Sequence, residues 1–402
     1  MRINTNPKKV EEILTRGVEK IYPSKEGLKK ILLSGKRIKV YCGYDPTAPT
    51  LHLGHAITLK KLAQFQELGH EVIMLVGDFT GMIGDPTEKL SPRKKLTRKE
   101  VLKNSKKYKK IASKVLDFYG KNPAKILYNS QWSDKLIFLN LIEIASNFTV
   151  QEMLTRDFFQ ERIKKKKPFF LHEFLYPLAQ AFDSVAMDVD LEIGGRDQIF
   201  NMLCGRDLMM ALMKKEKFVL ATKILVGSEG KKMGKTERNV VSLDEDPNQI
   251  YGKIMAWSDI LIEPGLELCT DLSSKEIKKI SSLMKRKKIN PKEAKSILAK
   301  EVVKIWHGKR KAERAEREFE RIFKEKKLPT KIPSINVSEK NLDILDLLMK
   351  IKLVQSKSEA KRLILQKGVK INGKLEKDWR KFIEIKKGMV VQVGKRKFSR
   401  II

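Results

Sequence analysis

The fold is decided by RIKVYCGYDPTAPTLHLGH, residues 37–55, together with the helix-like sequence that follows it. Its first nine residues are rich in β-favouring side chains and run into a Gly and an Asp-Pro turn, which predicts a strand over 37–45. After His55, apolar side chains recur at helical spacing, at Leu59, Leu62, Ala63 and Leu68. This order of strand, loop and helix indicates the beginning of a parallel α/β unit.

A second apolar run, EVIMLV at 71–76, leads into the glycine-rich segment GDFTGMIGDP at 77–86. A continuous apolar run of this length is typical of a strand buried on both faces of a parallel sheet. Ligands bind beyond the carboxyl ends of such strands, so the glycine-rich segment is a candidate ligand loop. The N-terminal half therefore predicts an α/β fold with a Rossmann-like, doubly wound parallel sheet.

The composition suggests an RNA partner. Lys and Arg number 84 against 49 Asp and Glu among 402 residues, a formal net charge of +35, and such an excess concentrates polyanions around a protein. A lysine-rich, solvated surface is the alternative interpretation.

The three cysteines have no CxxC spacing, which argues against a disulfide framework or a zinc site. The sequence contains no apolar run of membrane-spanning length, and its N-terminus lacks the apolar stretch of a secretory signal. We therefore expect a cytoplasmic protein.

Basic residues are concentrated in residues 92–125, which hold thirteen Lys or Arg against Glu100 and Asp117. Such a run is commonly one solvated face of a helix, and a contact with polyphosphate or RNA is the sharper alternative. The sequence does not choose between the two.

The remainder of the chain predicts two further parts. Residues 241–325 mix apolar positions at helical spacing with dense charge, which indicates a helical domain. Residues 328–340 contain Pro329 and Pro333 and are expected to form a linker. In residues 341–402, a helix-like stretch precedes VKINGKL, whose Asn372-Gly373 pair is a strong hairpin signal. This last segment, with 17 basic and 6 acidic residues, a net +11, resembles an α+β S4 RNA-binding domain.

Two short motifs contain side chains suited to binding phosphate groups. His52-Leu53-Gly54-His55 lies between the first expected strand and its helix, where backbone N–H groups and a helix N-terminus can meet phosphate. Its two imidazoles could stabilise charge that develops on phosphate, and Gly54 leaves room for an adenine ring. Taken alone, the two histidines could equally be packing or capping residues, or half of a metal site.

The second motif, GKKMGKT at 230–236, offers two cations on a loop suited to closing over pyrophosphate. In this order on an α/β chain, the two motifs resemble the HIGH and KMSKS signatures of class I aminoacyl-tRNA synthetases. Gly234 replaces the usual serine, which puts loop mobility in doubt but leaves Lys232 and Lys235 in place.

From about residue 37 onward, the chain resembles the tyrosyl-tRNA synthetases. The resemblance is carried by residues 41–55 and 77–86, by LHEFLYPLAQAFDS at 171–184 and by IGGRDQIFN at 193–201. It implies a catalytic domain over 1–230, a loop and an α-helical anticodon-region domain over 231–327, the linker, and the S4-like domain over 341–402.

The resemblance also implies a set of site residues. Those implied for tyrosine binding are Tyr41 and Asp183 at the phenol, Asp85, Tyr176 and Gln180 at the ammonium, and Gln198 at the carboxylate. Those implied for ATP binding are Cys42, Gly43, Gly54, Gly195, Asp197, Met233, Lys235 and Thr236. Those implied for catalysis are His52, His55, Thr47, Lys232, Lys235, Lys89 and Arg93, and no protein-bound metal is expected. Arg196 stands where a small hydroxyl residue is usual, and we expect it to point outward.

Each tyrosine-site residue also has a structural interpretation, as a core residue, a helix cap, a turn former or one face of a helix. The joint pattern implies instead an enzyme that activates tyrosine with ATP and Mg²⁺ and transfers it to tRNA(Tyr), as a homodimer. Such a site rejects phenylalanine because the missing hydroxyl would leave buried polar groups unpaired. The alternatives are a tryptophan-activating relative, a small-molecule nucleotidyltransferase and a noncatalytic RNA-binding protein.

Overall fold

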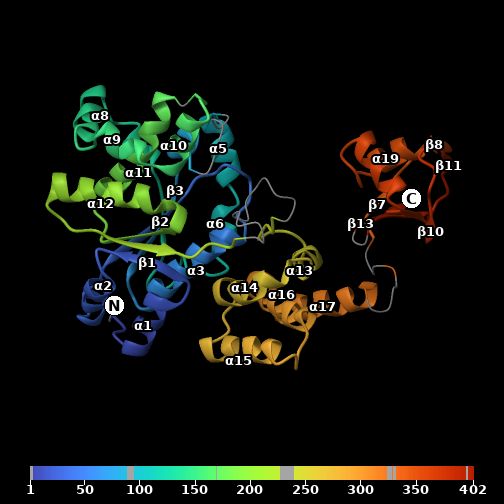
Figure 1. The fold of residues 1–402 in the computed structure, drawn as a ribbon, viewed down its shortest axis with the longest axis horizontal. Helices are drawn as coiled ribbons and strands as arrows, with labels where there is room; N and C mark the ends of the chain where they lie inside the picture. Colours follow the sequence, from blue (N-terminus) through green and yellow to red (C-terminus); the bar gives the residue numbers. More distant parts are fainter. Residues whose placement is uncertain are drawn as a thin grey trace. The chain divides into compact units, whose positions relative to one another are not determined.

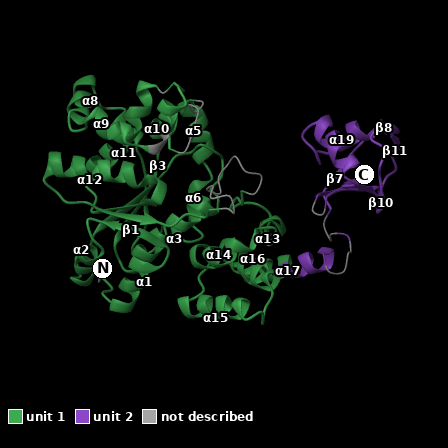
Figure 2. Ribbon diagram, viewed as in Figure 1, with its two compact units in different colours: residues 1–315 green, residues 316–402 purple. Residues whose placement is uncertain are grey.

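The computed structural model of the chain describes residues 3–87, 95–168, 170–226, 240–323, 328, 332–394 and 397–402. Residues 1–315 and 316–402 form two compact units (Figure 2). The division falls inside helix α17 (Lys309–Phe323), and the domain bounds expected from the sequence stay predictions. Within the described part of the chain, no helix combines the length and the apolar character needed to cross a membrane.

The first unit is built on a six-stranded sheet with the order β1-β6-β5-β2-β3-β4. Neighbouring strands are parallel except for β1, which pairs antiparallel with β6 at one edge. The strands, in sheet order, are β1 (Val18–Tyr22), β6 (Phe218–Thr222), β5 (Leu191–Gly195), β2 (Lys39–Tyr44), β3 (Glu71–Val76) and β4 (Lys125–Tyr128). The order reverses direction between β5 and β2, which is the switch point at which α/β sheets of this kind bind ligands.

The strand, loop and helix expected from residues 37–68 are confirmed. Strand β2 is followed by helix α3 (Leu53–Glu67), and the second apolar run is β3. All of β3 after Glu71 is buried, as a strand covered on both faces requires. The parallel register pairs Tyr41 with Ile73 and Tyr44 with Val76, so both strands end at the same edge.

Helices cover both faces of this sheet (Figure 1). Val219 packs against Met202 of one helix, whereas its neighbour Phe218 lies beside Gly27 of another. Successive strand residues point to opposite faces, so these two helices, α12 and α2, lie on opposite sides. The helices up to residue 213 are α1 (Pro7–Thr15), α2 (Lys25–Leu33), α3, α4 (Thr80–Ile83), α5 (Arg98–Ser105), α6 (Tyr108–Ala112), α7 (Ser130–Ser133), α8 (Phe138–Ala145), α9 (Val150–Leu154), α10 (Asp157–Lys164), α11 (Leu171–Met187) and α12 (Ile199–Met213).

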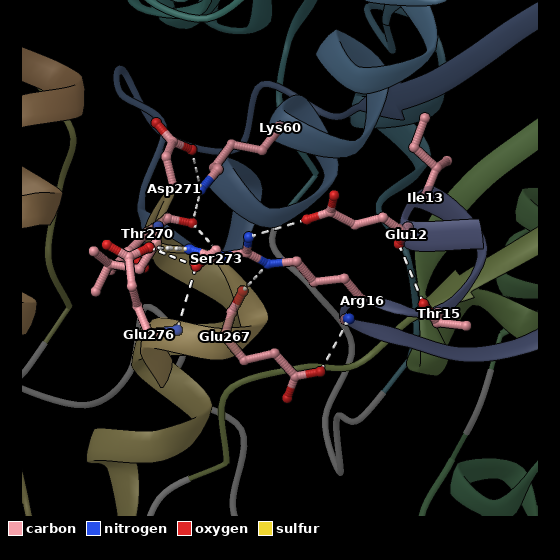
Figure 3. A network of polar contacts seen from close by, with 12 residues as sticks. Glu12, Ile13, Thr15, Arg16, Lys60, Glu267, Thr270, Asp271, Ser273 and Glu276 are labelled. Carbon is pink, nitrogen blue, oxygen red and sulfur yellow. Dashed lines mark hydrogen bonds and ion pairs between the residues drawn. The ribbon is translucent and has the colours of Figure 1, made fainter. Parts of the chain in front are cut away.

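The helical character expected for residues 241–325 is confirmed. Its members are α13 (Pro247–Met255), α14 (Ile262–Cys269), α15 (Ser274–Lys285), α16 (Pro291–His307) and α17. A polar network ties α14 to the sheet-bearing part (Figure 3). Arg16 donates to the backbone oxygens of Glu267 and Thr270, at 3.2 and 2.7 Å, and Lys60 of α3 pairs with Asp271 at 2.8 Å. The second half of α3 is thereby held against α14.

The second unit has its own apolar core, formed by buried residues from Val337 to Ile401. The helix and hairpin expected there are confirmed: Asn372 and Gly373 adopt the positive φ of 48° and 80° that a tight hairpin turn needs. Strand β7 lies inside the segment expected to be a linker and pairs parallel with β13. The elements are β7 (Ser334–Ile335), β8 (Asn341–Asp343), α18 (Ile344–Lys350), α19 (Lys357–Leu365), β9 (Val369–Ile371), β10 (Lys374–Leu375), β11 (Phe382–Glu384), β12 (Val390–Val393) and β13 (Lys397–Ile401).

Candidate active site

The candidate site follows the carboxyl edge of the parallel strands. Strand β2 ends at Tyr44 and delivers Asp45, and β4 ends at Tyr128 and delivers Asn129. Strand β5 ends at Gly195, just before Asp197 and Gln198. Because these strands run in one direction, their polar end residues meet at one edge of the sheet.

The histidines of the first motif lie at the N-terminus of α3. His52 is the N-cap residue, and its Nδ1 accepts from the backbone N–H of Gly54 at 3.1 Å. The Nδ1 of His55 accepts from the backbone N–H of His52 at 3.1 Å, and the two rings stack with centroids 3.8 Å apart. Since both Nδ1 atoms act as acceptors, each neutral ring carries its proton on Nε2 and can donate from there.

The chain just beyond the second motif lies beside the first motif. His52 and Ser242 form an antiparallel bridge. The backbone N–H of Leu53 donates to Val241 at 3.0 Å, and that of Leu243 donates to Leu51 at 2.8 Å. Residues 51–53 and 241–243, almost two hundred positions apart in sequence, are thus paired.

Tyr41 and Asp183, the residues expected at the phenol, are both buried but do not bond to each other directly. The Tyr41 hydroxyl contacts the Oγ of Ser184 at 2.8 Å. The Asp183 carboxylate accepts from Trp132 Nε1 at 2.8 Å and from Asn129 Nδ2 at 3.2 Å. Two fixed donors therefore orient the carboxylate, and a substrate hydroxyl could approach it beside Tyr41.

Burial dominates the electrostatics at this end of the site. It raises the pKa of Asp183 well above its usual range, although the hydrogen bonds from Trp132 and Asn129 act in the opposite direction. Burial also raises the pKa of Tyr41, and the charges of Glu192 and Asp183 raise it further. Tyr41 is therefore a neutral phenol at physiological pH and can donate a hydrogen bond.

Of the residues expected at the substrate ammonium and carboxylate, Asp85 and Gln198 lie in direct contact. Gln198 Nε2 donates to Asp85 at 2.7 Å. Tyr176 and Gln180 lie one turn apart on α11 and bond elsewhere: the Tyr176 hydroxyl donates to Asp45 at 2.9 Å, and Gln180 donates to Glu192 at 2.9 Å. Polar side chains thus link helix α11 both to Asp45, at the end of β2, and to Glu192, within β5.

Among the described residues expected to bind ATP, Cys42 and Gly43 lie near the end of β2, and Gly195 and Asp197 lie at or just after the end of β5. Gly43 is exposed, and Cys42 beside it is buried, which raises the pKa of its thiol to about 12. Gly195 must lack a side chain, because a Cβ there would lie 2.4 Å from Asp197 Oδ1. The outward orientation expected for Arg196 is confirmed, since its side chain is exposed and lies 3.9 Å from Glu19.

Several expected residues lie outside the described part of the chain. They are Lys89, Arg93, Lys232, Met233, Lys235 and Thr236. Thr47 lies within it, and its backbone N–H donates to the backbone oxygen of Asp45 at 2.7 Å.

The sequence analysis missed residues that hold the expected ones in place. Asp45 accepts from Tyr176 and, at 2.7 Å, from Thr80. Asn129 donates both to Thr80, at 2.9 Å, and to Asp183. The available signal was positional, because Asp45 and Asn129 directly follow strands β2 and β4.

Among the described residues, no group of three or more His, Cys, Asp or Glu side chains is arranged to hold a metal ion. Magnesium usually reaches such sites bound to substrate phosphates, with one or two carboxylates at most.

Comparison with known proteins gives consistent matches along the chain. Residues 33–324 match the family model of class I tRNA synthetases for tryptophan and tyrosine, and residues 324–401 match the C-terminal domain of tyrosine–tRNA ligases. The tyrosine–tRNA ligase of Thermotoga maritima is 41% identical over 98% of both chains. That of Carboxydothermus hydrogenoformans is 43% identical over 97% of both.

Solved structures support the fold. A C-terminally truncated mitochondrial tyrosyl-tRNA synthetase of Aspergillus nidulans has a TM-score of 0.66 at 23% identity, over 78% of this chain and 94% of its own. The Archaeoglobus fulgidus tyrosyl-tRNA synthetase complexed with L-tyrosine has a TM-score of 0.61 at 21% identity, over 77% of this chain and 100% of its own. The sheet and these matches define the fold of a class I aminoacyl-tRNA synthetase. Within that class, the chain belongs to the tyrosine–tRNA ligase family.

Proposed function

We propose that this enzyme activates L-tyrosine with ATP and transfers it to the 3′ end of tRNA(Tyr). One observation carries the assignment of the site. The Tyr41 and Asp183 side chains are suited to a phenol, and the stacked His52 and His55 are suited to phosphate. Tyr41 is on β2, the histidines begin the helix that follows β2, and tyrosine–tRNA ligases match almost the whole chain.

In the first step, the tyrosine carboxylate attacks the α-phosphorus of ATP, the bond to the bridging oxygen breaks, and pyrophosphate leaves. Positioning and charge stabilisation supply the catalysis. The Nε2–H groups of His52 and His55 are oriented as donors by their Nδ1 contacts, and we assign them to the phosphates together with Thr47. Lys232 and Lys235, with Lys89 and Arg93, are assigned to the leaving pyrophosphate.

At the other end of tyrosine, Tyr41 and Asp183 would bind the phenol, while Asp85, Tyr176 and Gln180 would bind the ammonium. Gln198, which contacts Asp85, would face the substrate carboxylate. We assign ATP contacts to Cys42, Gly43, Gly54, Gly195, Asp197, Met233 and Thr236. Mg²⁺ would arrive on the ATP phosphates and neutralise part of their charge.

In the second step, a terminal ribose hydroxyl of tRNA attacks the carbonyl carbon of tyrosyl-adenylate, and AMP leaves. The protein forms no covalent intermediate. The helical segment, the S4-like second unit and the basic helices α5 and α6 are the surfaces that we assign to tRNA. We also place the enzyme in the cytoplasm, as expected from the sequence.

Exposed apolar side chains support a homodimer. Helix α8 presents Phe138 with 77% of its surface exposed, and Leu139 and Ile142 beside it are at least half exposed. Leu171, at the start of α11, is 79% exposed. Apolar side chains gathered in this way commonly mark an interface, and we propose a second copy of this chain as the partner.

The test of activation is tyrosine-dependent exchange of labelled pyrophosphate into ATP, run beside phenylalanine and tryptophan. We expect exchange with tyrosine alone, and a fall of at least about 100-fold in the Asp183→Ala variant, because a site designed to pair the substrate hydroxyl loses its acceptor. Exchange with tryptophan instead would overturn the substrate, and no exchange by folded wild-type protein would overturn the enzyme.

The test of the dimer is sedimentation of wild type and the Phe138→Glu variant. We expect a dimer for the wild type and a shift toward monomer for the variant, because a buried charge opposes association. Leu365→Glu, at a position that is also well exposed but lies in the second unit, is the matched control and should stay dimeric. A wild-type monomer at all concentrations would contradict the proposal.

A further inference from the structure

A buried lysine lies behind the phenol end of the site. Lys217 directly precedes β6, and its side chain is completely buried. Its Nζ forms an ion pair with Glu192 of β5 and donates to Ser184 Oγ at 2.8 Å. Gly205 leaves the space for this arrangement, since a Cβ there would lie 2.5 Å from the Nζ and 2.8 Å from the Ser184 Oγ.

The Lys217 ammonium connects two residues assigned to opposite ends of tyrosine. Through Ser184 it reaches the Tyr41 hydroxyl, which lies 2.8 Å from Ser184 Oγ. Through Glu192 it reaches Gln180, whose amide donates to the other carboxylate oxygen at 2.9 Å. One buried cation therefore organises a phenol-contacting side chain and an ammonium-contacting side chain together.

The hydrogen-bonding capacity of Lys217 determines which atom donates in each hydrogen bond between Lys217, Ser184 and Tyr41. Lysine only donates, so Ser184 Oγ accepts from Lys217. The Ser184 side chain is fully buried, and a buried hydroxyl proton requires an acceptor. The Tyr41 oxygen, at 2.8 Å, is in place to accept it. With its oxygen engaged in this way, Tyr41 can donate its own O–H to a substrate phenol, whose proton can in turn go to Asp183.

We propose that Lys217 is a positioning residue for tyrosine selection, which acts through Ser184 to make Tyr41 a hydrogen-bond donor toward the substrate hydroxyl, and through Glu192 to hold Gln180. The inference rests on the proposed function. Lys217 touches no substrate in this scheme. It sets the polarity of the hydrogen bonds by which tyrosine is distinguished from phenylalanine.

The primary test is Ser184→Ala, which breaks the relay and leaves the Lys217–Glu192 ion pair intact. Pyrophosphate exchange is measured with tyrosine and with phenylalanine, and kcat and KM are determined for each. We expect the ratio of kcat/KM for tyrosine over phenylalanine to fall roughly tenfold, because Tyr41 then lacks the donor that fixes its orientation. Ser105→Ala is the matched control, since Ser105 is also buried on a helix and its hydroxyl donates to the backbone oxygen of Leu102 at 3.0 Å.

Lys217→Met is the second variant. Lys61→Met is its control, because Lys61 is also buried but donates to the backbone oxygens of residues 13 and 16. Both lysine variants are expected to lower the melting temperature, whereas only Lys217→Met should lower the tyrosine-to-phenylalanine ratio. If wild type exchanges with tyrosine but the ratio is unchanged in Ser184→Ala, the inference is overturned and the proposed function stands. If wild type shows no exchange, the proposed function itself fails.

Discussion

Gly54 lies where a single added carbon would disturb His52, at the end of the site that we assign to phosphate. A Cβ at this position would lie 2.8 Å from His52 Cε1 and 3.0 Å from its Nδ1. Real Cβ atoms do not tolerate such contacts, so the His52 ring would have to move. Glycine here therefore preserves the hydrogen bond from the Gly54 N–H to His52.

We predict that Gly54→Ala lowers the rate of tyrosine-dependent pyrophosphate exchange by about 10- to 100-fold, because a displaced donor loses much of its effect on the transition state. Tyrosine binding, measured by calorimetry without ATP, should stay within about twofold of wild type. If the exchange rate and the affinity for tyrosine fell by the same factor, the substitution would have disturbed the whole site.

At the scale of elements, helix α3 connects the phosphate end of the site to the helical segment. His52 and His55 lie at its beginning, and Lys60 and Lys61 lie further along. Lys61 Nζ donates to the backbone oxygens of Ile13 and Arg16, at 2.8 and 2.9 Å. Burial, together with the nearby Arg16 charge, lowers the pKa of Lys61 to about 7.

We predict that this lysine makes stability depend on pH above neutrality. Lysine in an unfolded chain has a pKa of about 10.4, so between pH 7 and 10 the unfolded state binds more protons than the folded state. The free energy of unfolding should therefore rise with pH in this window, by up to about 1.4 kcal/mol per pH unit. Urea denaturation at pH 7, 8 and 9 checks this. Lys61→Met should flatten the slope, and equal slopes for the two proteins would contradict the assignment.

At the scale of the whole molecule, part of the excess positive charge is concentrated on α5, α6 and the residues between them. Lys103, Lys106 and Lys110 are exposed there. Nearby, Tyr119 is 81% exposed, and Lys109 Nζ lies 4.9 Å from the centroid of its ring. Exposed cations beside an exposed aromatic ring suit the phosphates and bases of RNA.

We predict that reversing these three charges, in Lys103→Glu, Lys106→Glu and Lys110→Glu together, raises the KM for tRNA at least about tenfold and weakens its salt dependence. Pyrophosphate exchange should be unchanged, because it needs no tRNA. The control reverses Lys8, Lys9 and Lys30, which are exposed on α1 and α2 and give the same net charge. Equal effects of the two triple variants would show that total charge matters rather than this surface.

The sequence by itself determined the element types and the family. Apolar periodicity indicated β2, α3 and β3, and Asn372-Gly373 indicated the last hairpin, because these signals are local and depend on only a few neighbouring side chains. The two motifs, in their order on an α/β chain, indicated the class, because each motif is a short contiguous stretch that can be recognised without the structure. Residues 334–335 were expected in a linker, because a two-residue strand that pairs with the chain terminus has no local signal.

Only the tertiary structure decided which side chains support the site. Ser184, Glu192 and Lys217 had no role assigned from the sequence, although Ser184 directly follows Asp183. Burial of Lys217 depends on the space left by Gly205 of α12 and on the Glu192 carboxylate of β5. These partners come together only when strands β5 and β6 pair beneath α11 and α12, so no pattern of neighbouring residues could reveal them.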